Sequence, residues 1–323
     1  MESGEGVSRG KRDATLSGGI AMSHKPKNMA RSVFERLNNR AKERDENHEH
    51  LRVRYANERL LYRLSKSPYA NQFILKGGTL LLAWLIDNPH RVTQDIDFLA
   101  LMPPTIDGIT VVFEHLCTML VDEDDGIVFL LDTMNVTELP SAIRVELKAK
   151  IDKADPKLSI DIGYGDVITP EIQNITYPVL LPTMPAPKLQ AYPKYTVVAE
   201  KFEAIIDLEM RNTRYKDFYD IWFICTHYGF EGALLKTAIE RTFANRKTPI
   251  PTDIPIVFTS EFYADKTRKS QWQSFIKKDK ALINPEFENV IHEMSNFLMP
   301  IVQAILQQQS FPSKWNHQSL MWQ

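Results

Sequence analysis

The segment KGGTLLLAWLIDNPHRVTQDIDF constrains the fold of this chain more than any other part of its sequence. It follows a short apolar run at residues 73–75, which is bounded by turn-forming residues as a buried strand usually is. Its two consecutive glycines, Gly77 and Gly78, predict a tight turn. Residues 79–86 then have the pattern of a helix, and residues 95–101 that of a second strand. This order of elements predicts a mixed α/β unit.

The rest of the sequence extends this unit and adds a helical one. Residues 1–28 are rich in Gly, Ser and charge without apolar periodicity, which predicts a disordered tail. Apolar periodicity predicts helices between residues 30 and 64 and at 106–120, and strands at 126–131, 144–151 and 158–163. A Pro-rich stretch at 169–193 is expected to be extended. The chain after it is expected to be mainly helical, with an irregular break at 248–255. We therefore expect an α/β (α+β) fold with a small mixed sheet flanked by helices, followed by a mainly helical domain.

The composition excludes several classes of protein. Lys and Arg total 39 and Asp and Glu total 41, so the formal net charge of -2 excludes a protein that is basic overall. No run of 18 or more apolar residues is present, which predicts no membrane-spanning helix, and the N-terminus has no apolar core of a secretory signal. Cys117 and Cys225 form no C-x-x-C pair, which argues against a disulfide framework or a structural zinc site and favours the cytoplasm.

Two carboxylates stand at the start of the second strand, in the sequence Asp95-Ile96-Asp97. Alternation along a strand places residues i and i+2 on one face, so both carboxylates point to the same side. They repel each other unless a cation lies between them, and Mg²⁺ with a nucleoside triphosphate is the usual solution. A third acid, Asp161, lies in the apolar strand LSIDIGYGD. If the two strands pair, Asp161 completes a cluster able to hold two metals; otherwise it is an edge residue or part of an ion pair.

The glycine turn is suited to bind phosphate. Glycine lets the backbone approach a ligand closely, and the N-terminus of the following helix offers free N–H groups with a positive dipole. Lys76 and Thr79 flank the two glycines and add a cation and a hydroxyl. A Gly-Gly pair alone is usually only a turn, so the combination with the carboxylates favours a nucleotide site.

A second group of charged residues lies in VVAEKFEAIIDLEMRNTRYKDFYDIWFI. Lys201 falls on a largely apolar helix face, where the amine either reaches a triphosphate or extends past the rim of the core. Asp217 and Asp220 are three residues apart and share an apolar face of the next helix. Their candidate partners are Lys201, Arg214, Lys216 or a bound substrate, and a purely structural ion-pair network is the alternative.

Together these motifs resemble those of the DNA polymerase beta-like nucleotidyltransferase superfamily. More narrowly, the chain resembles the AbiEii family, the nucleotidyltransferase toxins of type IV toxin–antitoxin systems. The resemblance rests on RYANERLLYRLSKSPY, FILKGGTLL, HRVTQDIDF, LSIDIGYGD and the long VVAEKFEAIIDLEMRNTRYKDFYDIW. It implies a nucleotidyltransferase core with N-terminal helices at residues 29–190 and a helical domain at residues 191–323 that completes the nucleotide site. It also implies an antitoxin encoded nearby.

The resemblance further implies a mechanism and the residues that perform it. An acceptor hydroxyl attacks the α-phosphorus of an NTP in line and pyrophosphate leaves, while Asp161 orients or deprotonates the hydroxyl. The expected metal ligands for Mg²⁺ are Asp95, Asp97 and Asp161. The expected catalytic set adds Lys201, Asp217 and Asp220, of which one acid can be structural. The expected nucleotide-binding set is Lys76, Gly77, Gly78, Thr79, Arg91, Asp166 and Lys216. Arg91 is alternatively a brace for the carboxylates, and Asp166 a cap of its turn.

The acceptor is suggested by the family resemblance, which makes RNA, and especially the tRNA 3′ end, the expected substrate. Residues 261–280 contain six Lys or Arg interleaved with aromatic residues, and basic groups meet phosphates while aromatic rings stack on unpaired bases. The alternative interpretation is an amphipathic helix with a solvated face.

Two other functions are compatible with the same site residues: nucleotide transfer to a protein or small molecule, and nucleotide binding without catalysis. A D-x-D glycosyltransferase lacks support from K-G-G-T.

Overall fold

The structure of the protein, a computed structural model, describes residues 28–84, 93–102, 105–278 and 283–323. The predicted N-terminal tail lies outside these residues except for Asn28. Two helices follow it as predicted, α1 (Met29–Glu43) and α2 (His48–Lys66). Asn28 and Asn47 precede them, and their side chains accept hydrogen bonds from N–H groups of the first turn, which a helix leaves without internal partners.

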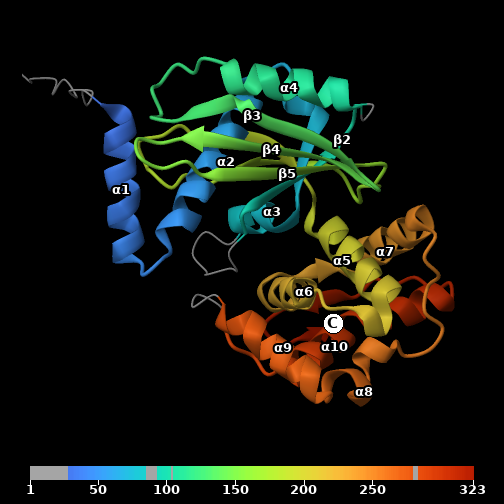
Figure 1. Cartoon of the computed structure of the whole chain (residues 1–323). Helices are drawn as coiled ribbons and strands as arrows, with labels where there is room; N and C mark the ends of the chain where they lie inside the picture. Colours follow the sequence, from blue (N-terminus) through green and yellow to red (C-terminus); the bar gives the residue numbers. More distant parts are fainter. Residues whose placement is uncertain (1–27, 85–92, 103–104, 279–282) are drawn as a thin grey trace, which may run out of the picture.

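A seven-stranded mixed sheet forms the centre of the N-terminal half (Figure 1). Its strands are β1 (Phe73–Lys76), β2 (Asp95–Ala100), β3 (Val128–Leu139), β4 (Ala142–Lys150), β5 (Lys157–Tyr164), β6 (Gln173–Thr176) and β7 (Lys188–Ala191). They lie in the order β3-β4-β5-β2-β1-β7-β6. The pairs β2–β5 and β1–β7 are parallel, and the other pairs are antiparallel. This architecture confirms the predicted fold class.

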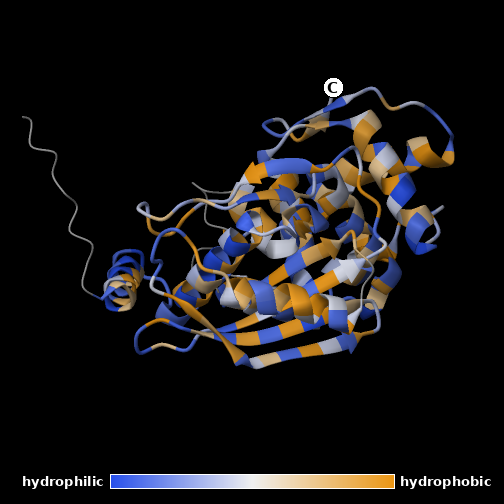
Figure 2. Ribbon diagram, turned by 90° about the horizontal axis from the view of Figure 1, so that it is seen from above, coloured by the Kyte–Doolittle hydropathy of each residue, from blue (hydrophilic) through white to orange (hydrophobic). Residues whose placement is uncertain are grey.

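The two faces of the sheet have different environments. Helices α2 and α4 (Ile106–Thr118) cover one face, where β4 buries Ile143, Val145 and Leu147. The intervening residues of β4 are less buried, and Figure 2 shows this alternation of hydrophobic and hydrophilic residues along the strands. Helix α3 (Gly77–Trp84) begins directly after β1, so the predicted glycine turn is reduced to Gly77, whose φ is +68°.

Two features of the sheet differ from the predictions. The stretch 169–193, expected only to be extended, contributes β6 and β7, and β7 pairs with β1. Each of these strands has only four residues, which is too short to show a clear alternation. The prolines around them also argue against strands. Strand β3 also continues to Leu139, beyond the predicted end at residue 131, with a register shift between Leu130 and Asn135. This irregularity breaks the period of two on which the prediction rested.

The C-terminal half is mainly helical, as predicted. Its helices are α5 (Lys194–Leu208), α6 (Tyr215–His227), α7 (Gly232–Arg246), α8 (Ser260–Tyr263), α9 (Lys266–Lys277) and α10 (Phe287–Leu306). It also contains a three-stranded antiparallel sheet that was not predicted from the sequence, formed by β8 (Phe230–Glu231), β9 (Lys314–Asn316) and β10 (Met321–Trp322). Strands of two or three residues are too short to show periodicity.

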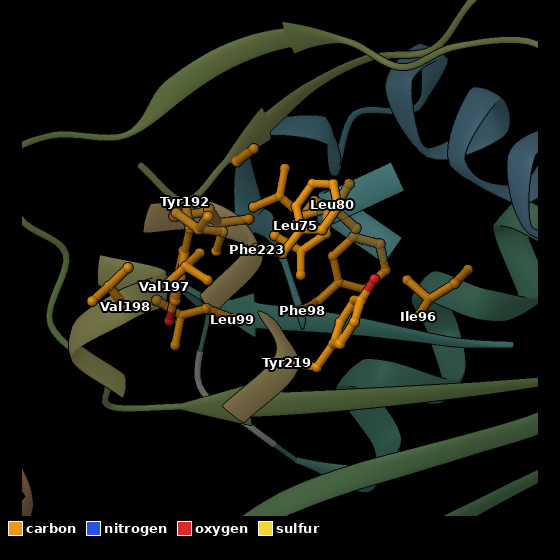
Figure 3. Close-up of a cluster of buried hydrophobic side chains, with 14 of the residues drawn as sticks. Leu75, Leu80, Ile96, Phe98, Leu99, Tyr192, Val197, Val198, Tyr219 and Phe223 are labelled. Atoms are coloured by element: carbon orange, nitrogen blue, oxygen red, sulfur yellow. The ribbon is translucent and has the colours of Figure 1, made fainter. Parts of the chain in front are cut away.

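The two halves share one apolar core. Figure 3 shows buried side chains of this core from β1, α3, β2, the residue after β7, α5 and α6: Leu75, Leu80, Ile96, Phe98, Leu99, Tyr192, Val197, Val198, Tyr219 and Phe223. Burial of these side chains is the main force that holds α5 and α6 against the sheet. Among the residues that the structure describes, no helix combines the length and apolar character needed to cross a membrane.

Candidate active site

Four polar side chains form a row across four neighbouring strands. Asp97 of β2 pairs in register with Asp161 of β5 on one side and with Lys76 of β1 on the other. Asp161 pairs in turn with Arg144 of β4. Residues paired across strands have their side chains on the same face, so the row consists of two acids between two cations. The pairing of β2 with β5, on which the predicted carboxylate cluster depends, is therefore present.

The row faces a cleft of about 1030 Å³ between the sheet and helices α5 and α6. Most of the residues singled out from the sequence line this cleft: Lys76, Gly77, Gly78, Asp95, Asp97, Asp161, Asp166, Lys201, Lys216 and Asp217. Two others do not line it, Thr79 and Asp220. Arg91 lies outside the described residues. The fold thus brings motifs from both halves of the chain into one cavity.

The carboxylate of Asp97 sits directly against Gly77. A Cβ atom at Gly77 would overlap the Oδ2 atom of Asp97, so only glycine leaves room for this acid. Burial raises the pKa of Asp97, the repulsion of Asp161 adds to this, and Lys216 and Lys76 oppose it. Thr79, expected to contact phosphate, is buried, and its hydroxyl donates a hydrogen bond of 2.6 Å to the carbonyl oxygen of Asp95. Thr79 therefore supports the strand that carries the two acids.

Asp161 is engaged by a residue to which the sequence patterns assigned no role. Arg144 donates two hydrogen bonds to Asp161, from Nε to Oδ1 over 2.7 Å and from its terminal nitrogen to Oδ2 over 2.8 Å. Within the described residues, no three His, Cys, Asp or Glu side chains converge closely enough to form a metal site as they stand. Only the register of β4 against β5 reveals Arg144, because its place in the sequence is that of an ordinary solvent-facing residue.

The opposite wall of the cleft carries a buried ionic group on α5 and α6. The Nζ atom of Lys201 lies 2.7 Å from Asp217 and 2.8 Å from Asp220, and both acids are almost completely buried. Arg214 lies 2.7 Å from the other oxygen of Asp217. The predicted partnership of these acids with Lys201 and Arg214 is thus observed. Lys216, the remaining candidate partner, is exposed and lines the cleft.

A second ionic group lies at the other end of the cleft. Lys76 reaches Asp166 over 2.6 Å and Glu200 over 3.3 Å, and Arg246 reaches the same two acids over 2.9 and 3.3 Å. Burial alone would lower the pKa of Lys76, but Glu200 and Asp166 outweigh it, so the pKa is raised and the amine stays charged. Arg246 also binds Glu203. Glu200 and Glu203 were not predicted from the sequence, where they would be recognisable only as acids next to Lys201 on a helix.

The basic segment at residues 261–280 left two interpretations open, a surface that stacks on unpaired bases and a solvated helix face. Phe262 and Trp272 are fully buried, and Trp272 packs against Phe287 with ring centroids 4.9 Å apart. These aromatic rings face the core because α8 and α9 are amphipathic, so they are not available to unpaired bases. The lysines of α9 remain exposed, and Lys280 lies outside the described residues. The solvated-face interpretation therefore fits this segment, which lies on the side of the helical part away from the sheet (Figure 1).

Comparison with known proteins gives one family. A model of the family described as nucleotidyl transferase AbiEii toxin, of type IV toxin–antitoxin systems, matches residues 59–293. The match includes both walls of the cleft. No curated protein matches the chain.

Two solved structures share the fold. The nucleotidyltransferase toxin MenT4 from Mycobacterium tuberculosis is 15% identical, with a TM-score of 0.53, and the alignment covers 87% of this chain and 99% of that one. The protein JHP933 from Helicobacter pylori is 16% identical, with a TM-score of 0.50 and coverage of 81% and 95%. At these identities the likeness establishes the fold alone.

Proposed function

The chain belongs to the AbiEii family of nucleotidyltransferase toxins of type IV toxin–antitoxin systems, and from this premise we propose that it transfers a nucleotide from an NTP to an RNA acceptor with Mg²⁺. The observation that carries the proposal is the cleft in which Asp97 and Asp161, paired in register, face the group formed by Lys201 and Asp217. Two acids and a cationic opposite wall suit a metal-bound triphosphate.

The carboxylates fit a divalent cation by their chemistry and their placement. Mg²⁺ prefers oxygen ligands, and Asp95, Asp97 and Asp161 offer only these. The partial burial of Asp97 and the repulsion of Asp161 both disfavour the anionic form of Asp97, and a cation at this position would relieve both effects. These three residues would hold the metal, which when bound neutralises phosphate charge and makes an acceptor hydroxyl more acidic.

The residues of the chain position the two substrates around this point. Gly77 and Gly78 line the cleft at the start of α3, where the backbone N–H groups of the first helical turn would meet the triphosphate beside the carboxylate of Asp97. Lys201 faces the phosphates from α5, held in place by Asp217 and Asp220. Asp161 receives or orients the proton of the acceptor hydroxyl. In this division of labour, residues 29–190 form the catalytic core and residues 191–323 complete the nucleotide site.

We further propose that Lys76 and Asp166 act mainly as an ion pair that shapes the cleft. Because both are committed to the group with Glu200 and Arg246, they shape the end of the cleft for the nucleoside more than they bind phosphate directly. Lys216 and Arg214 are the exposed cations of the other wall and are placed to meet the acceptor backbone. The acceptor is then an RNA, with the tRNA 3′ end as the first candidate, in the cytoplasm. A nearby antitoxin gene completes the system.

One assay tests the donor and the acceptor together. The purified protein is incubated with each labelled NTP in turn, with Mg²⁺ present, and offered tRNA, other RNA, total protein or a small-molecule extract. We expect label from one or two NTPs to enter RNA at its 3′ end, and tRNA most strongly. Label in protein or in small molecules instead of RNA contradicts the acceptor assignment, and no transfer from any NTP to any acceptor contradicts the proposed reaction.

A further inference from the structure

The residue that pairs with Asp161 has a role that neither the motifs nor the family assigns, and we propose that Arg144 is an exchangeable counter-ion of the metal site. In the metal-free protein Arg144 holds Asp161, and when Asp161 takes a divalent cation the guanidinium moves to a phosphate of the nucleotide or of the acceptor. This inference rests on the proposed function, because it concerns the same carboxylates.

The first support is the register of the sheet. Arg144 stands opposite Asp161 on β4, and Asp161 stands opposite Asp97 on β2. The two acids are therefore neighbours, and the arginine at the end of the row donates to both oxygens of Asp161. A cation held by both acids would compete with the positively charged guanidinium for the lone pairs of these oxygens and would repel it.

The second support is the exposure of the pair, compared with another pair in which an arginine donates to both oxygens of an aspartate. The side chains of Arg144 and Asp161 are 41% and 28% exposed and line the cleft. Arg63 and Asp125 also form two hydrogen bonds, but they are only 6% and 5% exposed, so separating them would leave buried charges unpaired. Separating Arg144 from Asp161 exposes both groups to water in the cleft. This pair is therefore built to open, while Arg63–Asp125 is structural.

The third support is the chemistry of the guanidinium. Its planar fork of N–H donors fits a carboxylate and a phosphate equally well, so the same side chain can serve both partners in turn. Once released, the positive charge of Arg144 is repelled by the cation at Asp161 and attracted by the phosphates that arrive with it. The neighbouring lining residues Ser141 and Ala142 are small and leave room for this movement.

The test uses Mn²⁺ as the probe and electron paramagnetic resonance of free Mn²⁺ as a readout independent of activity. The variants are Arg144→Gln, Arg144→Lys and the matched control Lys148→Gln, which removes a charge from the same face of β4 outside the cleft. Without nucleotide we expect Arg144→Gln to bind Mn²⁺ about fivefold to tenfold more tightly than the native protein. Arg144→Lys should fall between them, and Lys148→Gln should equal the native protein.

The second half of the test adds phosphate ligands at saturating Mn²⁺. Arg144→Gln should bind a non-hydrolysable NTP analogue, or tRNA, about fivefold to tenfold more weakly than the native protein. A loss for the analogue alone identifies the triphosphate as the second partner, and a loss for tRNA alone identifies the acceptor. A loss for neither overturns the exchange.

Other outcomes separate this inference from the proposed function. If the native protein binds Mn²⁺ and Arg144→Gln binds it equally or more weakly, the counter-ion role is wrong and the metal site stands. If none of the proteins binds Mn²⁺, with or without the analogue, the metal site itself is wrong and the inference fails with it. Equal melting temperatures of the variants exclude misfolding as the cause.

Discussion

The carboxylate of Asp97 occupies the space that a side chain at Gly77 would fill. The glycine adopts φ of +68°, which residues with side chains rarely adopt, and a Cβ atom there would overlap the acid. The glycine motif and the D-x-D motif are therefore two parts of one contact between β1, α3 and β2. This contact explains the close spacing of the two motifs in the chain.

Gly77→Ala should abolish nucleotide transfer. Any movement that relieves the overlap displaces Asp97, so we expect a loss of at least ~100-fold in the transfer rate, which is comparable to the removal of a group that stabilises the transition state. Gly165→Ala is the matched control, because Gly165 lines the same cleft with φ of +80°, but a Cβ atom there would meet none of the described residues within 4 Å. It should lower the unfolding free energy by about 1–2 kcal/mol from backbone strain alone. Equal transfer rates for the two variants would refute the proposed contact.

Asp97→Asn should stabilise the metal-free protein at neutral pH. Burial raises the pKa of Asp97 in the folded protein, so between the unfolded and folded pKa values the native state binds more protons and stability falls as pH rises. The amide removes this penalty. Melting temperatures of the chelated protein from pH 4 to 8 should therefore be higher for the variant, with the difference growing toward pH 8. Asp161→Asn, which loses its pairing with Arg144, should show no such gain; a lower melting temperature for Asp97→Asn would be inconsistent with this account.

Lys201→Met should destabilise the fold as well as stop transfer. The change removes the cation that the buried Asp217 and Asp220 share, and although Asp217 keeps Arg214, loss of such a buried partner costs about 3–5 kcal/mol. Adding Asp217→Asn and Asp220→Asn to this variant should restore much of the stability, measured by urea unfolding, but no transfer. Restored transfer in the triple variant would show that Lys201 is purely structural.

Lys216→Glu should weaken RNA binding more than a double charge reversal on α9. Lys216 is exposed on the cleft, and the loss of one phosphate contact should reduce the slope of log affinity against log salt by about 0.7 to 1. Lys277→Glu with Lys278→Glu changes more charge, but these residues lie on a helix whose aromatic side chains face the core. The opposite order of effects, measured by fluorescence anisotropy with labelled tRNA, would place the acceptor on α9.

Elements and site residues that a short stretch of sequence encodes could be predicted. Strands β1, β2, β4 and β5 were found because each is a short apolar or alternating run, and the carboxylates were found because acids inside such runs need partners. Residues that join the site only through strand register or helix packing could not be predicted in the same way. Arg144 becomes part of the site only because the register of β4 against β5 places it opposite Asp161. Glu200 becomes part of it only because the fold brings α5 within 3.3 Å of the amine of Lys76.

The aromatic residues of α8 and α9 depend on packing in the same way. Their interleaving with lysines looks like a nucleic-acid surface, but Phe262 and Trp272 occupy the buried stripe of amphipathic helices. Sequence spacing alone does not decide which face of such a helix meets the core, because that depends on α6 and α10 packing against it. The same dependence on packing explains why Thr79 supports the strand instead of lining the cleft.

Asp97 is proposed to belong to a metal-dependent nucleotidyl-transfer site, so nucleotide transfer by Asp97→Ala is the decisive measurement. Asp132→Ala, which removes an exposed acid of β3 outside the cleft, is the matched control. Transfer of label from NTPs to tRNA is measured for both, alongside melting temperatures that verify the fold. We expect transfer to fall to the background level in Asp97→Ala, with a melting temperature no lower than that of the native protein, while Asp132→Ala transfers normally. Unchanged transfer by a folded Asp97→Ala protein would contradict the claim.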